Sequence, residues 1–235
     1  MKRRIIFLLL FISIASFSQE ITGDELLEKA IQFHDPNGNW ATFNGELFVT
    51  MNVPKKSPRK SVIKINLPEE YFSVIATRDT ITTEYILDKN TSSFTFNGDN
   101  NPSEAIKKKY NLDIIRASFL KNYYTYLYGL PMKLKDNGTV IDQKVEKKNF
   151  KGKDYLVLKA TYNKEVGKDT WYFYFDPETC AMEVYQFFKE AKDSGEYILL
   201  SGLETINEIK IPKNRAWYYN KNNAYLATDI LSSQK

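Results

Sequence analysis

The chain offers few side chains that could act as nucleophiles or metal ligands. It has a single histidine, His34, and a single cysteine, Cys180. Any Ser-His-Asp or Cys-His arrangement would have to use His34, and one cysteine excludes an intramolecular disulfide or a CxxC site. His34 stands where the first predicted helix ends, which favours contact with the last helix carbonyls over catalysis. Cys180 begins a predicted strand and is expected to be a small residue that is buried or half-buried.

Carboxylates are abundant, but no motif selects a catalytic pair among them. The 29 Asp and Glu residues could supply the two carboxylates of a glycosidase, yet their spacing singles out none. The sequence contains no GxSxG elbow, Gly-rich phosphate loop, HExxH motif or Asp-rich calcium loop. We therefore expect a protein that is not an enzyme and that uses no metal or cofactor.

The positive signal is a concentration of aromatic side chains, which make up 14% of the residues. Tyrosines crowd residues 123–128 at the end of a predicted central helix, and residues 171–175 of a later strand are aromatic without exception. A strand that is aromatic on both faces is covered on both sides or borders a ligand cavity on one. Two alternatives stay open: a core filled with large residues, or an apolar pocket between sheet and helices.

The elements that would position these residues begin with a helix and a long amphipathic strand. Thr22 and Glu25 form a capping box before an apolar stripe, and the turn at 35–38 ends this helix. Residues 42–53 then alternate in polarity, as in an antiparallel sheet with one face on the core and one in water. The apolar face of this strand carries Phe43, Gly45, Leu47, Val49, Met51 and Val53.

Further strands are expected at turn-punctuated intervals on both sides of a helical insertion. Those after the first are 62–67, 71–76, 81–87, 92–96, 140–147, 155–162, 170–175, 181–189, 197–209 and 225–231. This pattern predicts an α+β fold, in which one antiparallel sheet of about eleven strands forms an incomplete barrel, because so broad a sheet must curl under its twist.

The helical insertion at 102–128 is expected to cover the sheet as a lid, with a break near Asn111. Its predicted apolar face carries Ile115, Phe119, Tyr123 and Tyr126. The opposite, polar stripe carries Ser118, Lys121, Asn122 and Thr125.

Residues 1–18 have the pattern of a cleaved signal peptide. Basic residues at 2–4 precede an apolar run at 5–15, and the small residues Ser16 and Ser18 resemble a cleavage site. The run is shorter than the roughly 20 residues that a membrane span needs, and no lipobox cysteine follows it. We therefore expect residues 19–235 to form one domain, a monomer that is periplasmic or extracellular and does not span a membrane.

The charge balance argues against a nucleic-acid partner. Without residues 1–18 the chain keeps 30 of its 33 Lys and Arg and all 29 Asp and Glu, which lowers its net charge from +4 to +1. Nucleic-acid binding needs a clustered basic surface, and a nearly neutral chain gives no general reason to expect one.

Four short motifs carry a resemblance to known proteins. They are the turn at 176–179 after an aromatic strand, His34-Asp35-Pro36 followed by Trp40, and the segments 126–132 and 212–218. The turn and the order of elements resemble the LolA-like periplasmic lipoprotein carriers, and the other three motifs resemble an uncharacterised family of secreted bacterial proteins in that superfamily. The resemblance implies a half-barrel under a helical lid and an apolar, lipid-like ligand, and it transfers no catalytic or ligand-contact residue.

The leading hypothesis is an exported carrier that holds an acyl chain or similar apolar ligand between sheet and lid. The alternatives are a non-catalytic structural or interaction module of the cell envelope with a filled core, and a carboxylate hydrolase that uses His34. An envelope protein could deliver or receive the ligand. The predicted cavity residues are Phe43, Leu47, Val49, Met51, Ile115, Phe119, Tyr123, Tyr126, Trp171, Phe173 and Phe175.

Overall fold

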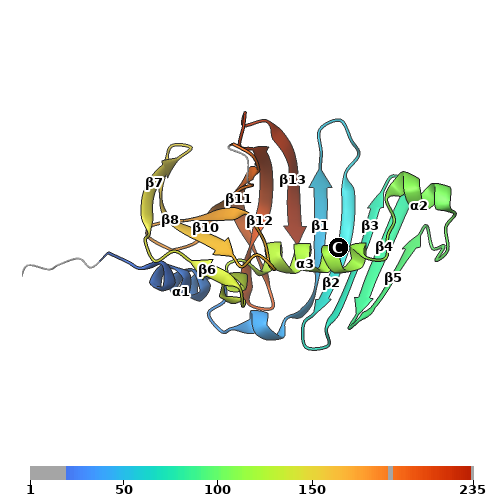
Figure 1. Ribbon diagram of the computed structural model, residues 1–235, viewed down its shortest axis with the longest axis horizontal. Coiled ribbons are helices and arrows are strands. Elements are labelled where there is room, and N and C mark those ends of the chain that lie inside the picture. Colours follow the sequence, from blue (N-terminus) through green and yellow to red (C-terminus); the bar gives the residue numbers. More distant parts are fainter. Residues whose placement is uncertain (1–19, 190–192, 234–235) are drawn as a thin grey trace, which may run out of the picture.

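A computed structural model describes residues 20–189 and 193–233 as one broad antiparallel sheet with helices packed on it (Figure 1). The signal peptide predicted at 1–18 lies outside these residues. The helices are α1 (Gly23–His34), α2 (Glu104–Tyr110) and α3 (Arg116–Gly129), with the 3-10 turns η1 (Asn39–Thr42) and η2 (Met132–Lys135). The fold is α+β with an open sheet, as predicted.

Thirteen strands form the sheet within the described ranges. They are β1 (Asn44–Asn52), β2 (Arg59–Asn66), β3 (Tyr71–Arg78), β4 (Ile81–Asp88), β5 (Thr91–Phe96), β6 (Thr139–Ile141), β7 (Glu146–Phe150), β8 (Lys153–Tyr162), β9 (Thr170–Phe175), β10 (Met182–Phe188), β11 (Glu196–Ile206), β12 (Ile209–Tyr219) and β13 (Tyr225–Ser232). Their order is β5-β4-β3-β2-β1-β13-β12-β11-β10-β9-β8-β6, and β7 also pairs with β8.

The sheet has two more strands than the eleven predicted. The predicted strand 140–147 is divided into β6 and β7, which both pair with β8. The predicted strand 197–209 ends at a tight turn, because Asn207 and Glu208 adopt positive φ angles of 49° and 63°. β12 follows that turn and was not predicted, since the turn contains neither Gly nor Pro.

Helix α3 lies across the strands, but it buries a different face from the one predicted (Figure 1). Asn111 breaks the helical insertion as expected, with a φ of 51°. The predicted apolar face begins in solvent, where Ile115 is 72% and Phe119 60% exposed. Tyr124 and Thr125 are buried instead. Thr125 tolerates burial because its hydroxyl donates a hydrogen bond to the Lys121 carbonyl at 2.7 Å.

The C-terminal end of α3 is fixed to the sheet by residues of the recognised motifs. The Trp40 ring lies so close to Gly129 that a side chain at this position would overlap it. The buried Arg215 guanidinium lies 4.0 Å from the centre of the Tyr128 ring and donates a hydrogen bond to the Leu127 carbonyl at 3.3 Å. These contacts leave the N-terminal half of α3 as the more exposed half.

His34 connects α1 to two strands and does not bind the helix carbonyls as predicted. Its Nδ1 donates to the Lys210 carbonyl at 2.6 Å, and the Met182 N–H donates to its Nε2 at 3.0 Å. Burial lowers the pKa of His34 from 6.5 to about 4, so the neutral ring is the folded form. Both ring nitrogens are engaged, which makes the role of His34 structural. Cys180 is buried, as predicted, and burial raises the pKa of its thiol.

Candidate ligand-binding groove beside helix α3

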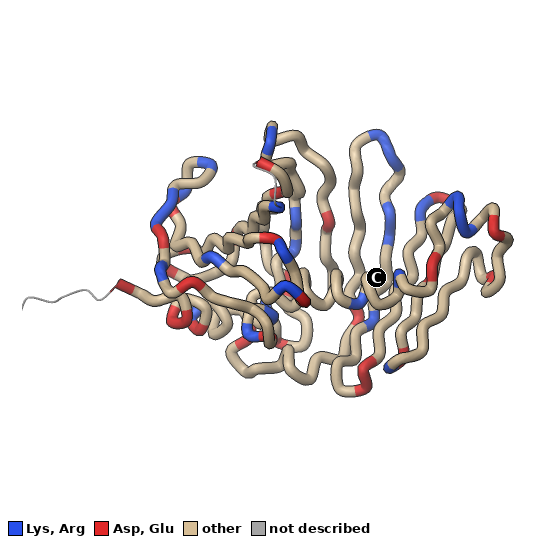
Figure 2. The backbone as a smooth tube through the Cα atoms, in the orientation of Figure 1, with Lys and Arg blue, Asp and Glu red and all other residues tan. Residues whose placement is uncertain are grey.

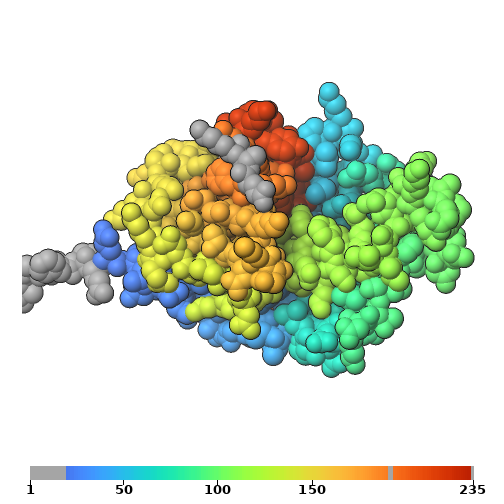
Figure 3. All heavy atoms as spheres, viewed as in Figure 1, coloured from blue at the N-terminus to red at the C-terminus, as the bar shows by residue number. Residues whose placement is uncertain are grey.

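Two cavities open side by side between α3 and the later strands. They have volumes of about 500 and 610 Å³. Both are lined by the same five residues, Phe119, Tyr123, Tyr126, Asp169 and Trp171. We call the two together the α3 groove. In Figure 3 the yellow-green atoms of α3 lie at the surface of the viewed face, beside the orange atoms of these strands.

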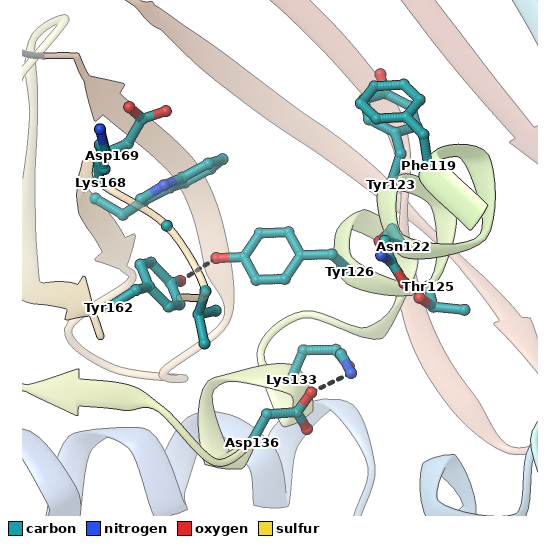
Figure 4. Close-up of a pocket in the computed structure, with 13 residues that line it drawn as sticks. Phe119, Asn122, Tyr123, Thr125, Tyr126, Lys133, Asp136, Tyr162, Lys168 and Asp169 are labelled. Atoms are coloured by element: carbon teal, nitrogen blue, oxygen red, sulfur yellow. Dashed lines mark hydrogen bonds and ion pairs between the residues drawn. The ribbon is translucent and has the colours of Figure 1, made fainter. Parts of the chain in front are cut away.

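The smaller compartment has polar groups at its wall. Figure 4 shows the Tyr126 hydroxyl pointing at Tyr162, with which it forms a hydrogen bond. Burial raises the pKa of Tyr162 to about 12 and that of Tyr126 well above its usual range, so both hydroxyls stay neutral. Lys133 and Asp136, below the two tyrosines in Figure 4, form an ion pair. This compartment can therefore take up hydrogen-bonding groups.

The larger compartment is floored by apolar side chains from strands distant in sequence. Met51 of β1, Trp217 of β12 and Ala227 of β13 meet there with Leu127 of α3. The Trp171 and Phe187 rings stack at 4.8 Å between centroids. Aromatic and aliphatic surface of this kind accommodates hydrocarbon, because such surface is stabilised when a ligand displaces water from it.

Charged groups border the groove but balance one another. Lys133 and Lys168 face Asp136 and Asp169 in the smaller compartment, and Lys189 with Glu196 borders the larger one. Burial raises the pKa of the Glu196 carboxyl above its usual value. The groove thus provides no strong fixed charge that would require an ionic ligand.

The structure brings five of the eleven predicted site residues together in the α3 groove and places the other six elsewhere. Met51, Phe119, Tyr123, Tyr126 and Trp171 line the groove. Ile115 precedes α3 and faces solvent. The remaining five are at most 2% exposed and belong to the hydrophobic core: Phe43, Leu47, Val49, Phe173 and Phe175.

Several groove residues were missed because their position depends on strand register. Phe187 reaches the groove because β10 pairs with β9 and places it opposite Trp171. Trp217 lies in the segment 212–218 that carries the family resemblance, but without β12 it could not be assigned to a face of the sheet. Tyr162, at the end of β8, lines the smaller compartment and forms a hydrogen bond with Tyr126, a contact that the sequence pattern does not indicate.

The described residues show no sign of a metal site or a membrane-spanning helix. No group of three or more His, Cys, Asp and Glu side chains within 20–189 and 193–233 could hold a metal ion. In the same part of the chain, every helix is too short or too polar to cross a bilayer.

The structure is thus an open antiparallel half-barrel with a helix across it, which is a LolA-like fold. Residues 2–233 match the family described as a family of unknown function (DUF6503), and the chain belongs to that family. No curated protein matches it.

Similar solved structures share the architecture at low sequence identity. A DUF1329 family protein from Desulfovibrio piger has a TM-score of 0.51 at 12% identity, over 90% of this chain and 92% of that chain. A LolA superfamily protein from Nitrosomonas europaea has a TM-score of 0.49 at 11% identity, with the same coverage. A putative outer membrane lipoprotein-sorting protein domain from Vibrio parahaemolyticus has a TM-score of 0.49 at 10% identity, over 91% of this chain and 92% of that chain. The likeness concerns the fold alone, and the predicted LolA-like fold is confirmed.

Proposed function

We propose that this protein is an exported carrier that binds an acyl chain or similar apolar moiety in the α3 groove. The observation that carries the proposal is the pair of adjoining cavities of about 500 and 610 Å³. Sites for small ligands commonly have volumes of about 300–1,000 Å³. A structural module with a filled core would need no cavity larger than one or two side chains.

The chemistry of the groove favours an amphiphile over a free ion. The larger compartment offers Trp171, Phe187 and Trp217 to a hydrocarbon chain, while the hydroxyls of Tyr126 and Tyr162 can bind a polar end in the smaller one. Each CH₂ group transferred from water contributes about 0.8 kcal/mol. Several acyl carbons would therefore give useful affinity without an ionic anchor.

The remaining parts of the proposal rest on the sequence. A signal peptide at 1–18 would export residues 19–235 as a single monomeric domain to the periplasm or the cell exterior. An acyl ligand held in a groove must be loaded and released, so an envelope protein that delivers or receives it completes the proposal. The absence of a catalytic motif and the structural role of His34 favour binding over hydrolysis.

Affinity for a fluorescent acyl probe tests the proposal through Phe119. This residue borders both compartments and is 60% exposed, so Phe119→Ser should leave the fold intact. Losing the burial of a Phe side chain, worth about 1.5–3 kcal/mol, should weaken binding of dansyl-undecanoic acid at least about tenfold.

Tyr219→Ser is the matched control, because Tyr219 is an exposed aromatic residue at the end of β12 that lines neither compartment. It should bind the probe as the wild type does. The proposal is wrong if the wild type ignores the probe, or if both variants weaken binding equally.

A further inference from the structure

We propose that a third cavity, between α3 and strands β2–β4, is a binding site for a phosphate-like anion. Its volume is about 420 Å³. Arg59 of β2, Arg78 of β3 and Arg116 of α3 line it, and Asp79 is its one carboxylate. We call it the arginine cavity. The arginine cavity and the α3 groove lie on different sides of α3. Leu120 and Tyr124 line the arginine cavity, whereas Phe119 and Tyr123 line the groove.

The strand pairing places two of these arginines against each other. Lys60 of β2 pairs with Thr77 of β3, and continuing this register by one residue puts Arg59 opposite Arg78. Like charges directly opposite in an antiparallel pair destabilise it. Figure 2 shows that basic residues also gather in the hairpin between β1 and β2 and in α2, in the same half of the molecule.

The protein does not neutralise this charge with ion pairs. None of the three arginines takes part in an ion pair among the described residues. Among residues 20–189 and 193–233, the buried Nε atoms of Arg59 and Arg78 have no hydrogen-bond partner, and Arg59 donates one long bond, 3.4 Å to the Tyr124 hydroxyl. A buried guanidinium donor without an acceptor costs free energy that a bound anion would recover.

The nearby carboxylates do not compensate the three charges. Asp79 is exposed, and within the described part of the chain it forms no ion pair with the arginines. Asp113 does not line the cavity, and its carboxylate accepts the Ile115 N–H at 2.9 Å. Asp229 is close enough to interact with Arg59, but it also interacts with Arg215 and does not line this cavity. The arginine cavity therefore retains a positive potential.

Arg116 strengthens this potential from the helix side. It lies in the first turn of α3, where the backbone N–H groups carry a partial positive charge and no acidic residue is present. A cation at this end of a helix is unfavourable, whereas an anion is stabilised there. Guanidinium groups also match the geometry of phosphate oxygens, which they bind through paired N–H bonds. The cavity thus favours a compact oxyanion with two negative charges.

Two sources could supply such a group. Free phosphate is one, and the headgroup of an amphiphile is the other, because Met51 of the α3 groove pairs directly with Arg59 in the sheet. In the second case the acyl chains would lie in the α3 groove and the phosphate in the arginine cavity. This second alternative rests on the proposed function.

Calorimetric titration of the full chain with inorganic phosphate, in chloride buffer, tests the site. The wild type should bind phosphate saturably, and Arg78→Gln and Arg116→Gln should each weaken binding at least about tenfold. Lys60→Gln removes the same charge from the exposed face of β2, next to Arg59, and should change the affinity by less than about twofold. Melting in phosphate-free buffer should show Arg78→Gln to be at least as stable as the wild type, because it relieves the repulsion from Arg59.

A second titration separates the two sources. Dioctanoyl phosphatidic acid is compared with dioctanoylglycerol, which has the same chains and no phosphate. A preference for phosphatidic acid that Arg78→Gln abolishes identifies a lipid headgroup, and binding of phosphate without that preference identifies a free anion. The inference is overturned if neither inorganic phosphate nor phosphatidic acid shows binding that depends on the arginines. It is also overturned if Lys60→Gln weakens that binding as much as the arginine variants do. Binding of dioctanoylglycerol by Arg78→Gln reports separately on the proposed function.

Discussion

His34 gives the sharpest stability prediction, because the neutral form of its ring is part of the folded structure. Nδ1 donates to the Lys210 carbonyl and Nε2 accepts the Met182 N–H, at 2.6 and 3.0 Å. A second proton on the ring would turn Nε2 from an acceptor into a donor that faces another donor. Burial adds to this cost, and together with the nearby Lys210 and Arg215 charges it lowers the pKa to about 4.

The magnitude of the effect follows from the difference between the folded and unfolded pKa. Because the folded value, about 4, lies below the unfolded value of 6.5, the unfolded chain binds the extra proton between them. The contribution of His34 to stability is complete above about pH 6.5 and falls as the pH drops toward 4. Since each pH unit is worth about 1.4 kcal/mol, the full loss is about 3 kcal/mol.

Urea unfolding of the wild type and His34→Gln, from about pH 7.5 down to about pH 4.5, measures this loss. Gln keeps a donor and an acceptor but does not titrate, so the wild type should lose stability relative to it as the pH falls below about 6.5. Burial raises the pKa of Asp229 and Glu196, so these two carboxyls favour the folded state as the pH falls. Their effect on stability is opposite to that of His34, but it is equal in both proteins. Because the chain has one histidine, parallel stability curves for the two proteins would refute this account of His34.

Three further substitutions test contacts that shape the sheet and the lid. Gly129→Ala should lower the free energy of unfolding by about 1–3 kcal/mol in urea, because its methyl group would overlap the Trp40 ring; an unchanged midpoint would show that α3 does not need this close contact. Asp176→Ala should cost about 1–2 kcal/mol, since one carboxylate oxygen accepts the Thr179 N–H and hydroxyl, each at 2.9 Å. Lys153→Met should cost less than about 1 kcal/mol, because Lys153, which pairs with Asp176 and Glu183, is itself exposed; an equal loss in the Asp176 and Lys153 variants would contradict that ranking.

The fold could be predicted where polarity alternates or where the chain must turn. Strand β1 was predicted because its side chains alternate between core and solvent, and the helix break was predicted at Asn111, which tolerates a positive φ. β12 was missed because the Asn207-Glu208 turn carries no Gly or Pro. Without Gly or Pro, the polar residues Asn207 and Glu208 between Ile206 and Ile209 could equally belong to one continuous strand.

The buried face of α3 and the groove could be predicted only in part. Helical periodicity selected Ile115 and Phe119, but where a helix contacts a sheet depends on which end is held, and the contacts of Trp40 and Arg215 hold the C-terminal end. The same apolar and aromatic residue types also line the core and the cavity. The sequence therefore could not show that Phe173 lies in the core and Trp171 in the groove without the register of β9. The arginine cavity combines residues from three elements, and no pattern in the sequence relates them.

The position of a bound acyl chain is the most direct test of the account, and the tryptophans can report it. The chain has three: Trp171 and Trp217 line the α3 groove, whereas Trp40 is buried against Gly129 outside it. The measurement is the quenching of tryptophan fluorescence by a brominated fatty acid. We predict saturable quenching in the wild type and in Trp40→Phe, and its loss in Trp171→Phe combined with Trp217→Phe. Equal quenching in the double variant, or none in the wild type, would contradict the assignment of the groove as an acyl site.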